Sequence, residues 1–196
     1  MATSSSPADA GHPPIEVGVI GSARIAPGDP RYADAERLGR ALASEGWAVV
    51  TGGYGGLMGA TSSAAASAGG HTVGLPMSGW KHLTPHESNA ELRWSADYAE
   101  RLRHLLTCAA VVALPGGIGT LSEAAIVWAA AQTEPGAASL VLVGDAWTDV
   151  HRAVGAGLVV DPDDLALAVC VDSVDDVVPA IRQSLAAERT LRGAHG

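Results

Sequence analysis

The chain has 196 residues, which is enough for one α/β domain with a substantial core and marginal for two. Apolar residues make up 47% and charged residues 17%, a balance typical of a globular chain. The formal net charge of −9 argues against sequence-independent binding of DNA or RNA, which needs a basic face. A small anionic ligand stays possible, because backbone N–H groups hold phosphate without lysine or arginine.

No run of about 18 apolar residues occurs, so no segment is predicted to span a membrane. Residues 1–14 are rich in Ser, Ala and Pro and lack a basic-then-apolar pattern, which indicates a disordered tail rather than a signal peptide. A cytoplasmic location is therefore expected. Cys108 and Cys170 lie in apolar runs outside any Cys-x-x-Cys or Cys/His cluster, so we expect two buried thiols rather than a disulfide or metal site.

Apolar runs alternate with helical patterns along most of the chain. Strands are predicted at residues 15–20, 47–51, 71–75, 109–114, 139–143 and 167–171. Helices are predicted at residues 30–44, 57–68, 96–107, 120–132, 149–155 and 174–188. Nearly unbroken apolar strands between helices indicate a parallel sheet covered on both faces, and right-handed crossovers make it a doubly wound, Rossmann-like fold. We expect one such domain over residues 15–188, followed by a frayed tail at 189–196.

Residues 76–94 show no clean period and are predicted to form a long loop, of a length that is often functional. Trp80 and Trp94 flank this loop, where they can stack on a base, shield a site or anchor the loop by packing. His82, His86 and His104 lack a carboxylate partner at ligand spacing. No metal site is therefore expected.

The strongest motif is Pro-Gly-Gly-Ile-Gly-Thr at residues 115–120, between a predicted buried strand and a helix. Glycines let the backbone turn sharply and approach an anion, and the helix start supplies unpaired N–H groups. Thr120 can cap the helix or donate its hydroxyl to a phosphate oxygen. A capping box with Glu123, three residues later, is the purely structural alternative. The spacing is neither a Walker loop nor Gly-x-Gly-x-x-Gly, which weakens an ATP or dinucleotide interpretation.

The second motif is Thr-Gly-Gly-Tyr-Gly-Gly-Leu-Met-Gly-Ala at residues 51–60, again a strand, a glycine loop and a helix. Four glycines in five positions are costly unless the backbone takes unusual angles or meets a ligand. A tight turn with close helix packing is the alternative. Another glycine, in Gly-Ser at 21–22, follows the first strand. All three clusters therefore fall at the carboxyl edge of the predicted sheet, where doubly wound folds bind ligands.

These two glycine motifs, with Gly-Ser-Ala-Arg at residues 21–24, resemble the LOG family, long mislabelled as lysine decarboxylases and similar to cytokinin-activating phosphoribohydrolases. The segment Val-Asp-Ser-Val-Asp-Asp-Val before the last helix also fits. The resemblance covers roughly residues 15–185. Lysine decarboxylation is not expected, because it normally needs a pyridoxal cofactor bound through a lysine and the only lysine, Lys81, lies in the irregular loop.

The resemblance implies hydrolysis of the N-glycosidic bond of a nucleoside 5′-monophosphate, to free base and ribose 5-phosphate, without a cofactor. Glu123 would face the ribose and stabilise the oxocarbenium-like sugar in the transition state. The residues that would bind the phosphate or line the same cleft are Ser22, Gly53, Met58, Gly116, Gly117, Gly119 and Thr120. The expected partners are a nucleoside monophosphate or related phosphate-bearing molecule and a second copy of the chain in a homodimer, with no nucleic acid or membrane.

One part of the family pattern is altered. Members usually carry Met-x-x-Arg-Lys before the fourth strand, where this chain has Tyr-Ala-Glu-Arg-Leu-Arg-His at residues 98–104. An ungapped alignment puts Glu100 at the position of the family arginine, and a one-residue deletion puts Arg101 there. Without that deletion, Arg101 is the next residue of the helix and points about 100° away. We expect Arg101 to contact the nucleotide and help the base to leave. The lysine is missing, and Ile126 stands where a second acidic residue is common.

These changes keep a second hypothesis in view, in which the ligand is held and not cut. Molybdenum-cofactor carrier proteins are similar in the Pro-Gly-Gly-x-Gly-Thr-Leu-Ser-Glu stretch, and sensor domains for nucleotide-derived signals also look alike. A protein that kept the fold but lost the site is the third hypothesis, and the intact glycine loops argue against it. Base specificity is not predictable, because its contacts would come from residues 80–101, where no motif is present.

Overall fold

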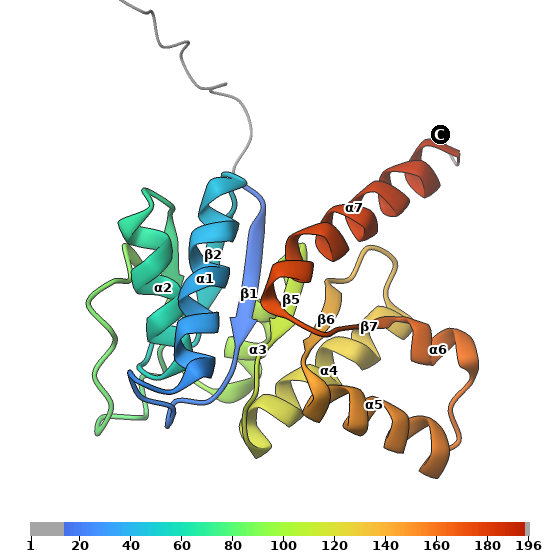
Figure 1. The fold of residues 1–196 in the computed structure, drawn as a ribbon, viewed down its shortest axis with the longest axis horizontal. Coiled ribbons are helices and arrows are strands. Elements are labelled where there is room, and N and C mark those ends of the chain that lie inside the picture. Colours follow the sequence, from blue (N-terminus) through green and yellow to red (C-terminus); the bar gives the residue numbers. More distant parts are fainter. Residues whose placement is uncertain (1–13, 195–196) are drawn as a thin grey trace, which may run out of the picture.

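Seven parallel strands form one sheet in the order β4-β3-β2-β1-β5-β6-β7 in the computed structural model, which describes residues 14–194 (Figure 1). The strands are β1 Glu16–Ile20, β2 Ala48–Thr51, β3 Thr72–Gly74, β4 Glu91–Leu92, β5 Ala110–Ala113, β6 Ser139–Val143 and β7 Ala168–Val171. The helices are α1 Pro30–Ser44, α2 Leu57–Ser67, α3 Tyr98–Leu106, α4 Ile118–Thr133, α5 Asp145–Gly157, α6 Pro162–Ala166, the 3-10 turn η1 Val174–Asp176 and α7 Val177–Ala194. The strand order reverses between β1 and β5, so the predicted doubly wound, Rossmann-like fold is confirmed.

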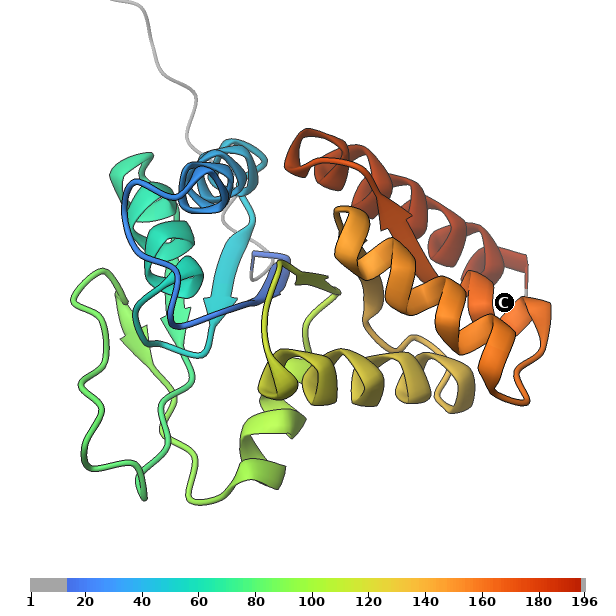
Figure 2. The ribbon, with the colours of Figure 1, turned by 60° about the horizontal axis from the view of Figure 1, so that its bottom comes forward.

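Each face of the sheet buries its own apolar cluster. Successive residues of a strand point to opposite faces, so Val112 packs with α1, α2 and α7, whereas Val111 packs with α3, α4 and α5. Figure 2 shows α1 and α2 on one side of the strands and α3 and α4 on the other. The loops that lead into helices of opposite faces therefore diverge at the switch point between β1 and β5, and this divergence positions the site.

Four details of the predicted secondary structure differ in the structure. The two-residue strand β4 lies inside the predicted loop 76–94, and the five-residue helix α6 was not predicted. Helix α5 begins at Asp145 rather than 149, because Gly144 with φ +92° turns the chain directly out of β6. Helix α7 continues to Ala194, so the predicted frayed tail is helical as far as residue 194. The predicted tail at 1–14 lies outside the described residues except for residue 14.

The two cysteines are both free thiols. Cys108 is buried as predicted, and burial raises its pKa to about 12. Cys170 is only half-buried, because β7 is an edge strand of the sheet. None of the described helices is both long and apolar enough to cross a bilayer.

Candidate functional site

Three loops at the carboxyl edge of the sheet are joined through the backbone of Ser22. Its N–H donates to the Pro115 carbonyl at 3.1 Å, and its carbonyl accepts from the Leu57 N–H at 2.9 Å. Gly56 has φ +68°, and a β-carbon there would overlap the backbone of Ser22 and Ala23. The β1–α1 loop is therefore fixed between the two glycine motifs, as their position at one sheet edge predicted.

Helix α4 begins directly after the glycines of the first motif. Gly117 occupies the N-cap position, and no side chain of the described residues caps the helix. Thr120 lies buried in the first turn instead of at the cap. The capping-box interpretation is therefore wrong, because a cap at Gly117 leaves Glu123 in the second turn. Gly116 is required by packing, since a β-carbon there would collide with the Thr120 side chain.

A cleft of about 680 Å³ opens beside the start of α4. Of the predicted binding residues, the cleft is lined by Ser22, Met58, Gly117, Gly119 and Thr120. Arg101 and Glu123 line it as well. The structure thus brings together most of the residues that the sequence singled out.

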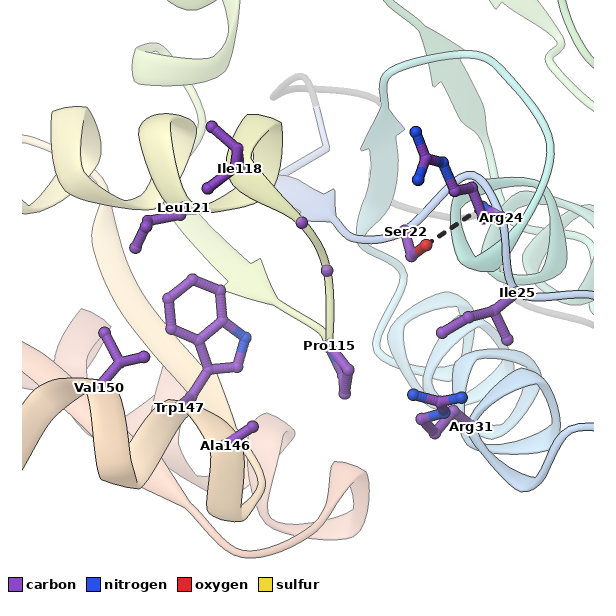
Figure 3. A pocket seen from close by; sticks show the side chains of 12 residues that line it. Ser22, Arg24, Ile25, Arg31, Pro115, Ile118, Leu121, Ala146, Trp147 and Val150 are labelled. Carbon is purple, nitrogen blue, oxygen red and sulfur yellow. Dashed lines mark hydrogen bonds between the residues drawn. The ribbon is translucent and has the colours of Figure 1, made fainter.

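Two predicted binding residues lie elsewhere. Gly116 lines a neighbouring cavity, which Figure 3 shows from close by. Gly53 lines neither cavity; it is buried with φ +82°, close to the backbone of Gly74. Its carbonyl accepts from the His86 N–H at 2.7 Å and from the Asn89 side-chain amide at 3.1 Å. Gly53 therefore holds the loop 76–94 against β3 rather than facing a ligand.

Arg101 and Glu123 form a buried ion pair in the wall of the cleft. The Arg101 Nη2 donates to Glu123 Oε1 at 2.9 Å, and Nη1 donates to the Leu75 carbonyl at 3.3 Å. Both side chains are more than nine-tenths buried. Helix α3 turns Arg101 inward together with Leu105, and Asp97 caps this helix by accepting from the Glu100 N–H. Arg101 therefore points into the cleft and not about 100° away from it.

The second glycine motif makes room for this ion pair. A β-carbon on Gly52 would lie 2.6 Å from the Arg101 Nη2 and 2.8 Å from the Met58 sulfur. Glycine at this position is therefore explained by the approach of the guanidinium and not by an unusual backbone angle. Burial raises the pKa of Glu123 above its usual range, while the charge of Arg101 opposes that shift.

Aromatic side chains form part of the wall of the cleft. The rings of Tyr54 and Trp80 stack with centroids 5.9 Å apart, and the Arg101 guanidinium lies 5.7 Å from the Trp80 centroid. The Tyr54 hydroxyl is fixed by the Met77 N–H at 2.9 Å. Trp80 thus shields the cleft, whereas Trp94 is about half exposed and does not line it.

Two tyrosines of the cleft were not predicted from the sequence. Tyr54 lies inside the second glycine motif, where its place between two glycine pairs was a usable signal. Tyr98 lines the cleft from α3, and its hydroxyl is 2.9 Å from that of Ser122. Within residues 14–194, no group of three His, Cys, Asp or Glu side chains is placed to hold a metal ion.

The strand order and the cleft at the switch point define a Rossmann-like α/β protein with a candidate small-molecule site. The model of the SLOG cluster4 family matches residues 14–134, which include both glycine motifs and Glu123. The chain belongs to this family, and the resemblance to the LOG family is confirmed.

Two curated relatives share one name. The chain is 34% identical over 160 residues to the cytokinin riboside 5′-monophosphate phosphoribohydrolase of Mycobacterium tuberculosis, a match that covers 76% of this chain and 84% of the relative. It is 41% identical over 95 residues to the protein of that name from Mycobacterium marinum, covering 46% of this chain and 50% of the relative. These matches show homology to the phosphoribohydrolase family.

Similar solved structures carry a different description. The molybdenum cofactor binding protein of Rippkaea orientalis superposes with a TM-score of 0.72 at 22% identity, over 89% of this chain and 99% of that chain. The molybdenum cofactor carrier protein of Chlamydomonas reinhardtii gives a TM-score of 0.72 at 25% identity, with the same coverage. Both confirm the fold, which hosts proteins of unlike function.

Proposed function

We propose that the protein is a nucleoside 5′-monophosphate phosphoribohydrolase, which releases a free base and ribose 5-phosphate. One observation carries the proposal: the buried Arg101–Glu123 pair lies in the wall of a cleft that begins at the uncapped N-terminus of α4. A carboxylate at that position is suited to a sugar cation, and the helix start to a phosphate. The homology to the Mycobacterium tuberculosis enzyme supports this assignment.

The 5′-phosphate is assigned to the first turn of α4. Gly117 and Gly119 line the cleft, and a β-carbon on either would meet nothing within 4 Å. Packing therefore does not require glycine at these positions, whereas an anion that approaches the backbone does. The N–H groups of the first turn, the partial positive charge of the helix and the Thr120 hydroxyl supply the favourable interactions.

The ribose is assigned to the space between the phosphate and Glu123. Glu123 comes five residues after the first residue of α4, which places it about 7.5 Å further along the helix axis. When the C1′–N bond breaks, its electron pair stays with the base nitrogen and the oxygen of a water bonds to C1′; the water gives up one proton and the base nitrogen takes one up, so the step balances. Positive charge on the sugar ring peaks between these events, so an ionised Glu123 lowers that barrier selectively.

Arg101 has two tasks in this scheme. Its charge favours the ionised form of the buried Glu123 carboxyl and so opposes the rise in pKa that burial causes. Its guanidinium, oriented by the Leu75 carbonyl and by the face of Trp80, also donates hydrogen bonds toward the departing base. The Tyr54–Trp80 wall offers a flat apolar surface on which the base stacks.

A carrier that holds its ligand uncut is the alternative function. The observations that favour it are the missing lysine next to Arg101, where Leu102 stands, and Ile126 in place of a second acidic residue on α4. The similarity to the Chlamydomonas reinhardtii carrier fold is compatible with this alternative.

Turnover of a nucleotide panel separates the two functions. The purified protein is incubated with purine and pyrimidine nucleoside 5′-monophosphates, and free base is measured by chromatography. We expect release from at least one nucleotide, and loss of release in Glu123→Gln with binding retained. If nucleotides bind to the wild-type protein but no base appears at high protein concentration, the hydrolase assignment is overturned in favour of the carrier.

A further inference from the structure

A second cavity adjoins the main cleft at the β5–α4 loop, and Figure 3 shows the side chains that line it. Its volume is about 560 Å³, within the range of about 300–1,000 Å³ that small-molecule sites occupy. The main cleft of about 680 Å³ is of similar size. Each cavity is thus large enough for one organic ring system, and the proposed phosphoribohydrolase reaction uses only one of them.

The walls of the second cavity are mainly apolar. Trp147 and Val150 come from α5 and Leu121 from α4, while Ile25 comes from the β1–α1 loop. Figure 3 shows Ile25 across the cavity from Trp147, with Pro115 between them. The Trp147 indole is fixed, because its Nε1 donates to the Leu114 carbonyl at 3.0 Å. A fixed indole and other apolar side chains around one cavity suit a flat ring.

The two cavities share one rim, which includes Ser22, Arg24 and Gly117. Arg24 pairs with no carboxylate of the described residues. The other arginine of the second cavity, Arg31, is already neutralised, because its Nε and Nη2 donate to the Asp29 carboxylate at 2.9 and 2.6 Å. Arg24 is therefore the available cation at the junction, next to the glycines assigned to phosphate.

We propose that the protein also binds ligands in which two organic groups are joined by a phosphoanhydride, as in a dinucleotide, and that such a ligand spans both cavities. This inference rests on the proposed function, since it extends the nucleotide that the main cleft binds. The first nucleotide occupies the main cleft with its phosphate on Gly117. The second phosphate meets Arg24, whose guanidinium donates charge-assisted hydrogen bonds. The second ring then enters the space between Ile25 and Trp147.

Titration calorimetry with three probes tests this proposal. AMP, ADP and diadenosine diphosphate differ by one phosphate and then by one nucleoside, and the Glu123→Gln variant serves as host so that no probe is cleaved. We expect diadenosine diphosphate to bind about tenfold or more tightly than ADP, because the second adenosine buries an apolar ring. A second substitution, Ala146→Trp, places an indole in the second cavity. This substitution should bring the affinity for diadenosine diphosphate to within about twofold of the affinity for ADP and leave the affinity for AMP unchanged.

The matched control is Ala156→Trp, an exposed position on the same helix outside the cavity. It should leave the binding of all three probes unchanged. The proposal is overturned if AMP binds but diadenosine diphosphate binds no more tightly than ADP, or if its advantage survives Ala146→Trp. If neither these probes nor any purine or pyrimidine nucleoside 5′-monophosphate of the turnover panel binds, the nucleotide site itself is refuted and the proposed function falls with the inference, so the two failures are distinguishable.

Discussion

Replacing Glu123 by glutamine separates the two roles of the buried ion pair. The substitution keeps the shape of the side chain but removes the negative charge that lies 2.9 Å from the Arg101 guanidinium. Both side chains are more than nine-tenths buried, so the guanidinium is left buried without a counter-charge. Breaking a buried pair on one side costs about 3–5 kcal/mol, and water in the adjoining cleft reduces this to about 2–3 kcal/mol. For a chain of this size, the Tm then falls by about 5–10 °C.

The same substitution removes the charge that stabilises the sugar cation, so kcat should fall by about 10²–10³-fold. Thermal unfolding and base release are measured on Glu123→Gln, Arg101→Gln and the double variant. The double variant should lose about 1–3 kcal/mol less free energy of unfolding than the two single variants lose in sum, and it should stay inactive. The control is Asp149→Asn, which breaks an ion pair that is 70% exposed on both sides and should leave the Tm unchanged. A Glu123→Gln protein with wild-type Tm and wild-type turnover would contradict both the structural and the catalytic role of the ion pair.

Three further predictions follow from the same geometry. Activity should be lost as the pH falls through the raised pKa of Glu123, so the acid limb of the kcat/KM profile should lie above the ordinary glutamate value of 4.5. Arg101→Gln should move that acid limb to higher pH, and a limb that does not move in this variant contradicts the pairing. Gly119→Val should weaken the binding of inorganic phosphate in calorimetry with little change in Tm, because a β-carbon at this position meets nothing within 4 Å. Gly116→Ala should instead lower the Tm, and equal effects of the two substitutions on Tm would count against assigning the phosphate to Gly119. Trp80→Ala should raise KM about tenfold through loss of a base stack, and an unchanged KM would remove this ring from the base site.

Much of the fold was predictable because its elements carry strong local patterns. The helix at 30–44 was predicted with the bounds that the structure shows, since Asp29 caps it and Pro30 occupies its first position. Short elements were missed for the opposite reason. Strand β4 has two residues and α6 has five, which is too few for either period to show. Their positions depend on tertiary contacts, such as the Arg93 N–H donating to the Gly74 carbonyl beside β4.

The candidate site was predictable where backbone chemistry decides and not where packing decides. The glycine loop before α4 was identified from its residues and spacing, and the role of Glu123 from the resemblance to the LOG family. The orientation of Arg101 was not, because it depends on how α3 packs and on the space that Gly52 leaves for the guanidinium. Gly53 was assigned to the cleft because of its motif, yet its positive φ and its bond to His86 serve the loop instead.

The central claim is that the cleft beside α4 cuts an N-glycosidic bond with the Arg101–Glu123 pair. It is tested most directly by a single-turnover reaction, in which excess protein is mixed with the nucleotide that it binds best, and base and ribose 5-phosphate are both quantified. We expect equimolar base and ribose 5-phosphate from the wild-type protein, and intact bound nucleotide from Glu123→Gln. Recovery of intact nucleotide from the wild-type protein after prolonged incubation would contradict it.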